Sequence, residues 1–382
     1  MKKRLFTPGP TTVPESVLLK MAEPIIHHRS AEYSELFAQI NKGLKYLFQT
    51  ENDVLTFTSS GTGAMEAAVV NLLSPGDRAL VVRGGKFGER WAEICLAYGV
   101  QVEPVDVEWG YAVEPQQIAA KLQSIPEIKA VFTTHSETST GVINDIETIG
   151  QIVKQHPALL VVDVITSIGT HRLLPDQWHI DVAVAGSQKG LMLPPGLAFA
   201  SVSQKAWEAA ESSKLPKYYW SFSAAKKSLA KNQNPYTPAV SLLVGLKKSL
   251  EIIQEEGLEK VWARHQRHAR ATRAAVRAMG LELFAKNPSN ILTIVKIPEG
   301  IDGKLLLKTI GTKYGVTMAG GQAALAGKVV RISHMGYTDD FDILTAVAAL
   351  ERGLKDLGWH FELGSGVAAA QRVLTEENGR EL

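Results

Sequence analysis

A series of short apolar segments, spaced along residues 54–202, constrains the fold of this chain more than any other feature. Most of them are separated from the next by a stretch in which apolar residues recur with helical periodicity. Strands that alternate with helices form βαβ units, whose parallel strands are covered by helices on both faces. The sequence therefore predicts an α/β fold with a mostly parallel sheet flanked by helices. The predicted strands are residues 54–57, 79–82, 100–105, 130–135, 159–163, 181–186 and 197–202.

The pattern changes after residue 202. Residues 215–234 are rich in Lys, Ser and aromatic side chains and have weak periodicity, which indicates a surface or an interface. Two long helical stretches follow, and residues 281–359 then show strand, helix, strand and helix, which is typical of a small α/β domain. We expect an N-terminal arm, a large domain, a smaller C-terminal α/β domain and a polar tail at residues 1–20, 21–255, 256–362 and 363–382.

The composition excludes several classes of function. The net charge of the 382 residues is +2, which gives no reason to expect nucleic acid or an anionic membrane as a partner. Cys95 is the only cysteine, so the chain can form neither an internal disulfide nor a cysteine-ligated metal site. The sequence also lacks an apolar run of the roughly 18 residues that a membrane span needs. We therefore expect a cytoplasmic protein.

Lys189 follows the predicted strand 181–186 at the edge of the sheet where chemistry usually takes place. In open α/β sheets, ligands bind beyond the carboxyl ends of the strands. A lysine at such a position is a solvated surface residue in most proteins, but it can also bind phosphate or act as a Schiff-base nucleophile. The strand before Lys189 does not distinguish these three roles.

Three further features can act together with Lys189. Residues 59–64 form a Gly-rich turn between a strand and a helix, where backbone N–H groups favour phosphate, although such turns also arise as plain N-caps. Asp163 ends the strand 159–163 at the same edge of the sheet, either as a helix cap or as a functional acid. Arg331 lies in a β-branched run and needs an anionic partner, either a structural one or a substrate carboxylate.

Together these features match the needs of pyridoxal phosphate chemistry. That chemistry requires a cradle for a phosphate, an acid facing a ring nitrogen, an amine for an aldehyde and a guanidinium for a carboxylate. The turn at 59–64, Asp163, Lys189 and Arg331 offer these groups in turn. The sequence therefore predicts pyridoxal 5'-phosphate as the cofactor.

Several motifs carry a more specific resemblance through their order and spacing. They are Ser-Gln-Lys at 187–189, His-Ser-Glu-Thr-Ser-Thr-Gly at 135–141, Val-Asp at 162–163, Thr-Pro at 237–238 and Gly-Lys-Val-Val-Arg-Ile at 327–332. With them the chain resembles the class V, fold-type I pyridoxal-phosphate aminotransferases. Within that family it is similar to the alanine–glyoxylate and serine–glyoxylate (serine–pyruvate) group. The resemblance implies a seven-stranded sheet in the large domain and a homodimer whose subunits share their active sites.

The resemblance also implies roles for individual residues. Lys189 would form the Schiff base and move the substrate proton, Asp163 would keep the ring nitrogen protonated, and Arg331 would bind the substrate carboxylate. The other implied contacts are Thr62, Gly63 and Gln188 at the phosphate, Thr138 at the ring hydroxyl, Phe87 on the ring face, Thr237 at the phosphate of the partner's site and Gly9 in the amino-acid pocket.

Two positions depart from some members of the family. These members carry Trp in place of Phe87 and His in place of Ala64. Stacking on the ring survives the first change, whereas the second removes a polar group beside the cofactor. Tyr236 lies near a tyrosine of the family but out of register with it.

The implied reaction is transamination of a small amino acid, alanine or serine, with glyoxylate or pyruvate as the acceptor. The sequence shows no second arginine for a dicarboxylate side chain, which favours small donors without ranking them. A cysteine desulfurase is one alternative, but it needs a nucleophilic cysteine on a mobile loop, and Cys95 lies in a helical stretch. Another alternative is an accessory subunit, because some similar chains have been labelled as a subunit of a soluble hydrogenase.

Overall fold

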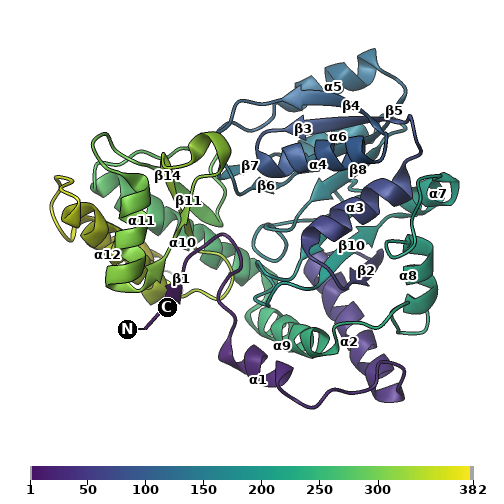
Figure 1. Cartoon of the computed structure of the whole chain (residues 1–382), viewed down its shortest axis with the longest axis horizontal. Coiled ribbons are helices and arrows are strands. Elements are labelled where there is room, and N and C mark those ends of the chain that lie inside the picture. The colour runs from purple at the N-terminus through teal and green to yellow at the C-terminus, as the bar shows by residue number, and fades with distance from the viewer. Residues whose placement is uncertain (1, 379–382) are drawn as a thin grey trace.

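The computed structural model describes residues 2–378, which form a larger and a smaller part (Figure 1). The larger part contains the long sheet and most of the helices, and the smaller part contains the C-terminal strands and helices (Figure 1). The start of the chain lies on the smaller part (Figure 1). The division into domains at residues 20, 255 and 362 stays a prediction.

A seven-stranded sheet with the order β2-β10-β9-β8-β5-β3-β4 forms the centre of the larger part. The strands are β2 (Asp53–Phe57), β3 (Arg78–Arg83), β4 (Gln101–Asp106), β5 (Ile128–Thr134), β8 (Leu159–Asp163), β9 (Val182–Gly186) and β10 (Ala198–Val202). β10 runs antiparallel to both of its neighbours, and the other neighbouring strands are parallel. The prediction of a mostly parallel sheet flanked by helices is confirmed.

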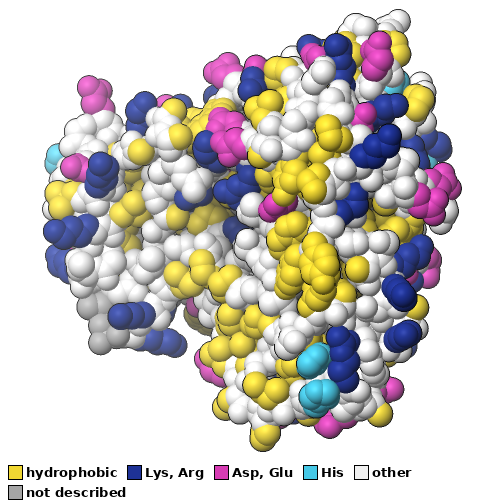
Figure 2. Space-filling view, turned by 45° about the vertical axis from the view of Figure 1, so that its right-hand side comes forward, with side chains coloured by type: hydrophobic (Ala, Val, Ile, Leu, Met, Phe, Trp, Pro, Cys, Tyr) yellow, Lys and Arg dark blue, Asp and Glu magenta, His cyan; other side chains and the backbone are white. Residues whose placement is uncertain are grey.

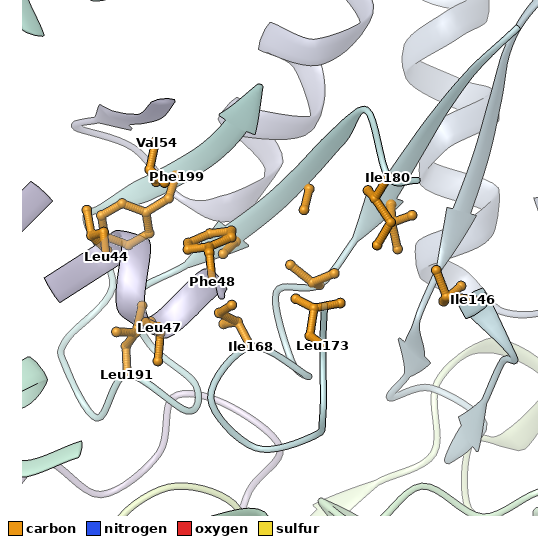
Figure 3. Packing of buried hydrophobic residues seen from close by; sticks show 14 of the residues in the cluster. Leu44, Leu47, Phe48, Val54, Ile146, Ile168, Leu173, Ile180, Leu191 and Phe199 are labelled. Atoms are coloured by element: carbon orange, nitrogen blue, oxygen red, sulfur yellow. The ribbon is translucent and has the colours of Figure 1, made fainter. Parts of the chain in front are cut away.

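Helices cover both faces of this sheet. One face packs against α3 (Gly61–Leu72), α4 (Lys86–Ala97), α7 (Gln204–Ser212) and α8 (Phe222–Leu229). The other face packs against α2 (Ala31–Phe48), α5 (Pro115–Ser124), α6 (Ile146–Val153) and α9 (Val240–Glu256), with α1 (Glu15–Met21) beside α9. Successive strand side chains point to opposite faces, so Val161 packs on the first side and Val162 on the second. Figure 3 shows Leu44 and Phe48 of α2 beside Phe199 of β10.

The starts of two helices follow from their capping residues. Ser30 caps α2, because its hydroxyl accepts the N–H of Tyr33 at 3.1 Å. α3 begins at Gly61, because Ser60 has the extended backbone of an N-cap. Thr62 and Gly63 therefore lie in the first turn of α3, where helix N–H groups lack carbonyl partners four residues before them.

The smaller part has an antiparallel sheet with the order β11-β14-β13. Its strands are β11 (Leu292–Lys296), β13 (Ala319–Gly320) and β14 (Val329–Ser333), and its helices are α10 (Leu258–Ala278), α11 (Gly303–Tyr314), α12 (Asp340–Asp356) and α13 (Ser365–Asn378). The predicted polar tail contains α13, which buries Ala370 and Leu374 in the core of this part. Residues 379–382 of that tail lie outside the described residues. No helix within residues 2–378 is long and apolar enough to cross a membrane.

The N-terminal arm links the smaller part to the loop that carries Lys189. β1 (Arg4–Leu5) pairs in parallel with β12 (Val316–Thr317), and Ser333 donates its N–H to the carbonyl of Phe6 at 2.8 Å. Further along, Thr11 donates its N–H to the carbonyl of Gln188 at 3.1 Å and its hydroxyl to the carbonyl of Lys189 at 2.9 Å. The arm therefore fastens the smaller part to the end of β9.

Candidate active site

A cavity lies beyond the carboxyl ends of the parallel strands, where the sequence analysis predicted the chemistry. It is enclosed by the end of β8, the loop after β9, the start of α3 and the hairpin of β6 (Ser136–Glu137) and β7 (Val142–Ile143) that follows β5. The predicted residues that line it are Gly9, Thr62, Phe87, Thr138, Asp163, Gln188 and Lys189. Figure 2 shows the hollow between the two parts of the molecule, with basic side chains in its wall.

Lys189 is buried in this cavity, with 8% of its surface exposed. Its Nζ donates a hydrogen bond to the carbonyl of Pro8 in the N-terminal arm. Burial lowers the pKa of Lys189 from 10.5 to about 8, although the carboxylate of Asp163 opposes this shift. A lysine with this pKa is partly neutral near physiological pH, so its amine can act as a nucleophile or a base.

Gly9 lies against Lys189 and leaves no room for a side chain. The backbone of Gly9 has a φ of +130°. A Cβ atom at this position would lie 2.5 Å from both Cε and Nζ of Lys189. Glycine is therefore required here for two reasons: the backbone conformation favours it, and the close approach of Lys189 leaves no room for a side chain.

Asp163 ends β8 and points its carboxylate into the same cavity. Among residues 2–378, the N–H of Ile165 is the only hydrogen-bond donor to this carboxylate, at 2.8 Å. Burial raises the pKa of Asp163 to about 7, against the hydrogen bond from Ile165. A buried carboxylate with a single donor can still bind a cationic N–H of a ligand.

The opposite wall offers groups that suit a phosphate. The first turn of α3 provides backbone N–H groups and the positive end of the helix dipole. Gln188 lines the same cavity, and its side-chain oxygen is buried without a hydrogen-bond partner in the described part of the chain. Gly63 is not among the lining residues, but it lies within this first turn. Ala64 is fully buried in the core behind it.

Arg331 of β14 borders the cavity from the smaller part without lining it. Its Nε donates to the carbonyl of Gly320 at 2.7 Å, and one guanidinium nitrogen donates to the carbonyl of Thr138 at 3.1 Å. Burial lowers the pKa of Arg331, while the carboxylate of Glu137 opposes this shift. Arg331 therefore links the two parts of the molecule beside Thr138, which lines the cavity.

Glu137 lies within the motif at 135–141, but its role is visible only in the structure. The fully buried carboxylate accepts the N–H groups of Phe87 at 3.0 Å and Gly88 at 3.1 Å. It also accepts the N–H of Ser139 at 3.0 Å and its hydroxyl at 2.6 Å. Burial raises the pKa of Glu137, and these hydrogen bonds oppose the shift. Glu137 thereby fixes Phe87 and the β6–β7 hairpin relative to each other.

Arg90 is a second functional residue that the sequence analysis missed. It lines the cavity, and its guanidinium lies 4.9 Å from the centre of the Phe87 ring. It also donates to the hydroxyl of Thr62 at 3.2 Å. The signal was available, because Arg90 follows Phe87 by three positions and therefore lies on the same face of the predicted helix.

Thr237 does not reach the cavity within its own chain. It is exposed and lies in a separate surface pocket with Ile25, Ile26, His27 and His28. Tyr236 stacks instead on Tyr218 and Tyr219, with ring centres 5.5 and 5.2 Å apart. Thr237 is therefore a predicted site residue that the structure does not bring to the cavity of its own chain.

Comparisons with known proteins agree with this geometry. The family described as aminotransferase class V matches residues 4–345. The "Soluble hydrogenase, small subunit" of Synechococcus sp. (strain PCC 6716) is 48% identical over 98% of this chain and 99% of its own.

Two further relatives are named as aminotransferases. The serine–glyoxylate aminotransferase of Hyphomicrobium methylovorum is 42% identical over 97% of this chain and 94% of its own. The L-aspartate–glyoxylate aminotransferase of Paracoccus denitrificans is 41% identical over 96% of this chain and 95% of its own. The crystal structure of ureidoglycine–glyoxylate aminotransferase from Bacillus subtilis matches with a TM-score of 0.95 at 30% identity, covering 98% of each chain.

Proposed function

The chain belongs to the class V aminotransferase family, and we propose that it transfers the amino group of a small amino acid to glyoxylate or pyruvate with pyridoxal 5'-phosphate as its cofactor. One observation carries this proposal: Lys189 and Asp163 share a buried cavity in which burial shifts the pKa of each toward neutrality. Shifts of this kind are typical of groups that exchange protons during catalysis.

The residues of the cavity fit pyridoxal phosphate. Asp163 is a buried carboxylate with one donor and suits a protonated ring nitrogen. The start of α3 suits the phosphate, and the side-chain amide of Gln188 lines the cavity with N–H groups that can donate to phosphate oxygens. Phe87 presents its ring at the cavity, and Thr138 lies on the wall nearest Arg331. We propose that these residues, with Thr62 and Gly63, hold the cofactor.

Residues in and beside the cavity have separate roles in the proposed transamination. When bound, pyridoxal phosphate supplies an aldehyde for the amino group and an electron sink for the charge left at Cα. Lys189, as a partly neutral amine, takes the proton from the substrate Cα. Arg331 binds the substrate carboxylate, and Gly9 keeps the space beside Lys189 open. Asp163 holds a proton at the ring nitrogen.

The choice of substrates rests on the family relatives. The names of two of them specify glyoxylate as the acceptor, with serine or L-aspartate as the donor. We propose a small donor, alanine or serine, for this chain. The two half-reactions share one cavity, so we expect ping-pong kinetics.

A cysteine desulfurase activity is disfavoured by the position of Cys95. The thiol is fully buried within α4, and burial raises its pKa to about 12. A thiol that stays protonated and has no access to the cavity is a poor nucleophile. Cys95 packs among the apolar residues that cover one face of the sheet.

An accessory role in a hydrogenase is the second candidate, favoured by the names of two similar chains. With Cys95 as its single cysteine, the chain cannot itself hold a cysteine-ligated metal cluster. Such a role would also leave the Lys189–Asp163 cavity unexplained. We therefore rank it below transamination.

We propose a homodimer with shared active sites and a cytoplasmic location. The exposed position of Thr237, which would serve the partner's phosphate, supports the dimer. So do the nearby exposed side chains of Ile25 and Tyr218, of which 73% and 80% are accessible. The location is supported by the absence of any possible disulfide within the chain.

A spectral half-reaction tests the proposed function. Purified protein should develop a visible absorption band with added pyridoxal phosphate, and alanine or serine should convert it. Glyoxylate or pyruvate should then restore the band. Protein that stays colourless with added cofactor would contradict the proposal, as would full transamination by Lys189→Ala.

A further inference from the structure

Arg90 places a positive charge in the cavity that the proposed roles do not use. Its guanidinium lines the cavity, lies over the Phe87 ring and donates to the Thr62 hydroxyl at 3.2 Å. Within residues 2–378, no carboxylate forms an ion pair with Arg90, whereas its helix neighbours Lys86 and Glu89 pair with each other at 2.5 Å. A partly buried guanidinium without a carboxylate is prepared for an anionic ligand.

The hydrogen bond from Arg90 determines how the Thr62 hydroxyl can act. A hydroxyl has one proton to donate and can accept at its lone pairs. Since a guanidinium only donates, Thr62 must accept from Arg90. The hydroxyl proton of Thr62 is then free to point away from Arg90. Thr62 is the second residue of α3, so this proton lies at the N-terminal end of the helix, which carries the positive end of the helix dipole.

The position of Arg90 favours the phosphate end of the cavity over the substrate end. Arg90 contacts Thr62 at the start of α3, whereas Arg331 contacts the carbonyl of Thr138 on the opposite wall. The two guanidinium groups therefore serve different walls.

We propose that Arg90 is a positioning residue for the cofactor phosphate, which orients the Thr62 hydroxyl as a donor and adds a positive charge behind it. This inference rests on the proposed function, because it assumes that the phosphate of pyridoxal phosphate occupies the start of α3.

Binding of two cofactor forms to the apoprotein tests the proposal. The affinities for pyridoxal phosphate and for pyridoxal, which lacks the phosphate, are measured by absorbance and tryptophan fluorescence. For Arg90→Gln we expect the affinity for pyridoxal phosphate to fall at least about tenfold, the scale of one charge-assisted hydrogen bond. The affinity for pyridoxal should stay within about twofold. Inorganic phosphate should also compete less well with pyridoxal phosphate in this variant.

Three further variants make the test specific. Lys86→Gln removes one positive charge from the same helix outside the cavity and should change neither affinity. Thr62→Val should repeat the loss seen in Arg90→Gln, and the double variant should lose less than the sum, because Arg90 acts through Thr62. Arg90→Lys keeps the charge and should recover part of the affinity.

The outcomes separate the inference from the function on which it rests. If the wild-type apoprotein does not bind pyridoxal phosphate, both are overturned. Equal losses for pyridoxal phosphate and pyridoxal in Arg90→Gln overturn only the inference, and assign Arg90 to the ring or to folding. Unchanged affinities with a selective loss of the half-reaction with aspartate, compared with alanine, also overturn it and assign Arg90 to a substrate carboxylate.

Discussion

Lys189 and Asp163 share a cavity in which water solvates neither group well, since they are 8% and 3% exposed. Burial disfavours the charged form of each, so it lowers the pKa of the lysine and raises that of the acid. Each charge stabilises the other, which limits both shifts. Arg331 lowers the pKa of Lys189, whereas Asp163 raises it, because a nearby positive charge disfavours the ammonium form.

The pH dependence of cofactor uptake should report these charges. Only the neutral amine attacks an aldehyde, so the rate at which apoprotein takes up pyridoxal phosphate should rise with pH around a midpoint of about 8. Asp163→Asn removes the charge that raises the lysine pKa and should lower the midpoint. Arg331→Gln removes a charge that lowers it and should raise the midpoint. Stopped-flow absorbance measures the rates, and shifts of the same sign in both variants would contradict this account.

The helix α4 shows which features of an element its sequence can predict. Periodicity predicted helices between the strands, the structure has α4 at Lys86–Ala97 between the predicted strands 79–82 and 100–105, and the family resemblance assigned Phe87. The partner of its first turn could not be predicted in this way. Glu137 is distant in sequence, and periodicity does not reveal which buried carboxylate accepts the N–H groups of a helix start.

Glu137→Gln tests whether the start of α4 depends on a group that only accepts hydrogen bonds. All the partners of Glu137 are donors, namely the N–H groups of Phe87, Gly88 and Ser139 and the hydroxyl of Ser139. The amide nitrogen of glutamine would face some of these donors and leave them unpaired. We expect the free energy of unfolding to fall by about 2 kcal/mol or more, measured by urea denaturation of the apoprotein. The same change at the exposed Glu51 should have little effect; equal stabilities of the two variants would argue against this role.

The N-terminal arm passes Lys189 at a position where a side chain has no room. In Gly9→Ala, the new methyl group would lie 2.5 Å from Lys189 Nζ, so either the arm or the lysine must move. We expect the variant to take up pyridoxal phosphate at least about tenfold more slowly, since a misplaced reacting group costs about this much or more. Gly76→Ala is the matched control, because Gly76 also has a positive φ but no neighbour within 4 Å. If Gly9→Ala takes up pyridoxal phosphate at the wild-type rate, the arm can move aside without slowing the reaction of Lys189.

On the scale of the whole molecule, the sequence predicted the sheet better than the connections between the parts. The strand 159–163 was predicted with its observed bounds, because strands buried on both faces are continuous apolar runs. The pairing of β1 with β12 joins the N-terminal arm to the smaller part, and strands of two residues carry no periodicity that could reveal it. The packing of α13 into the core was not predicted for a related reason, since only a few residues such as Ala370 and Leu374 mark its buried side.

The proposed sharing of active sites concerns the whole dimer, because Thr237 lies outside the cavity of its own chain. Consider a dimer of one Lys189→Ala chain and one Thr237→Glu chain. If Thr237 serves the partner's cavity, one site is complete, with its lysine from the Thr237→Glu chain and its threonine from the Lys189→Ala chain. The other site lacks both. If Thr237 acts within its own chain, neither site is complete.

Co-expression of the two variants with different affinity tags allows the mixed dimer to be purified. We expect it to show about half of the wild-type activity, since one of the two sites of a symmetric dimer is intact. The Lys189→Ala homodimer should be inactive. The Thr237→Glu homodimer should be impaired at limiting pyridoxal phosphate, because its added carboxylate repels the phosphate. A mixed dimer no more active than these two parents would show that Thr237 does not cross the interface, and a chain that light scattering finds monomeric would exclude a shared site altogether.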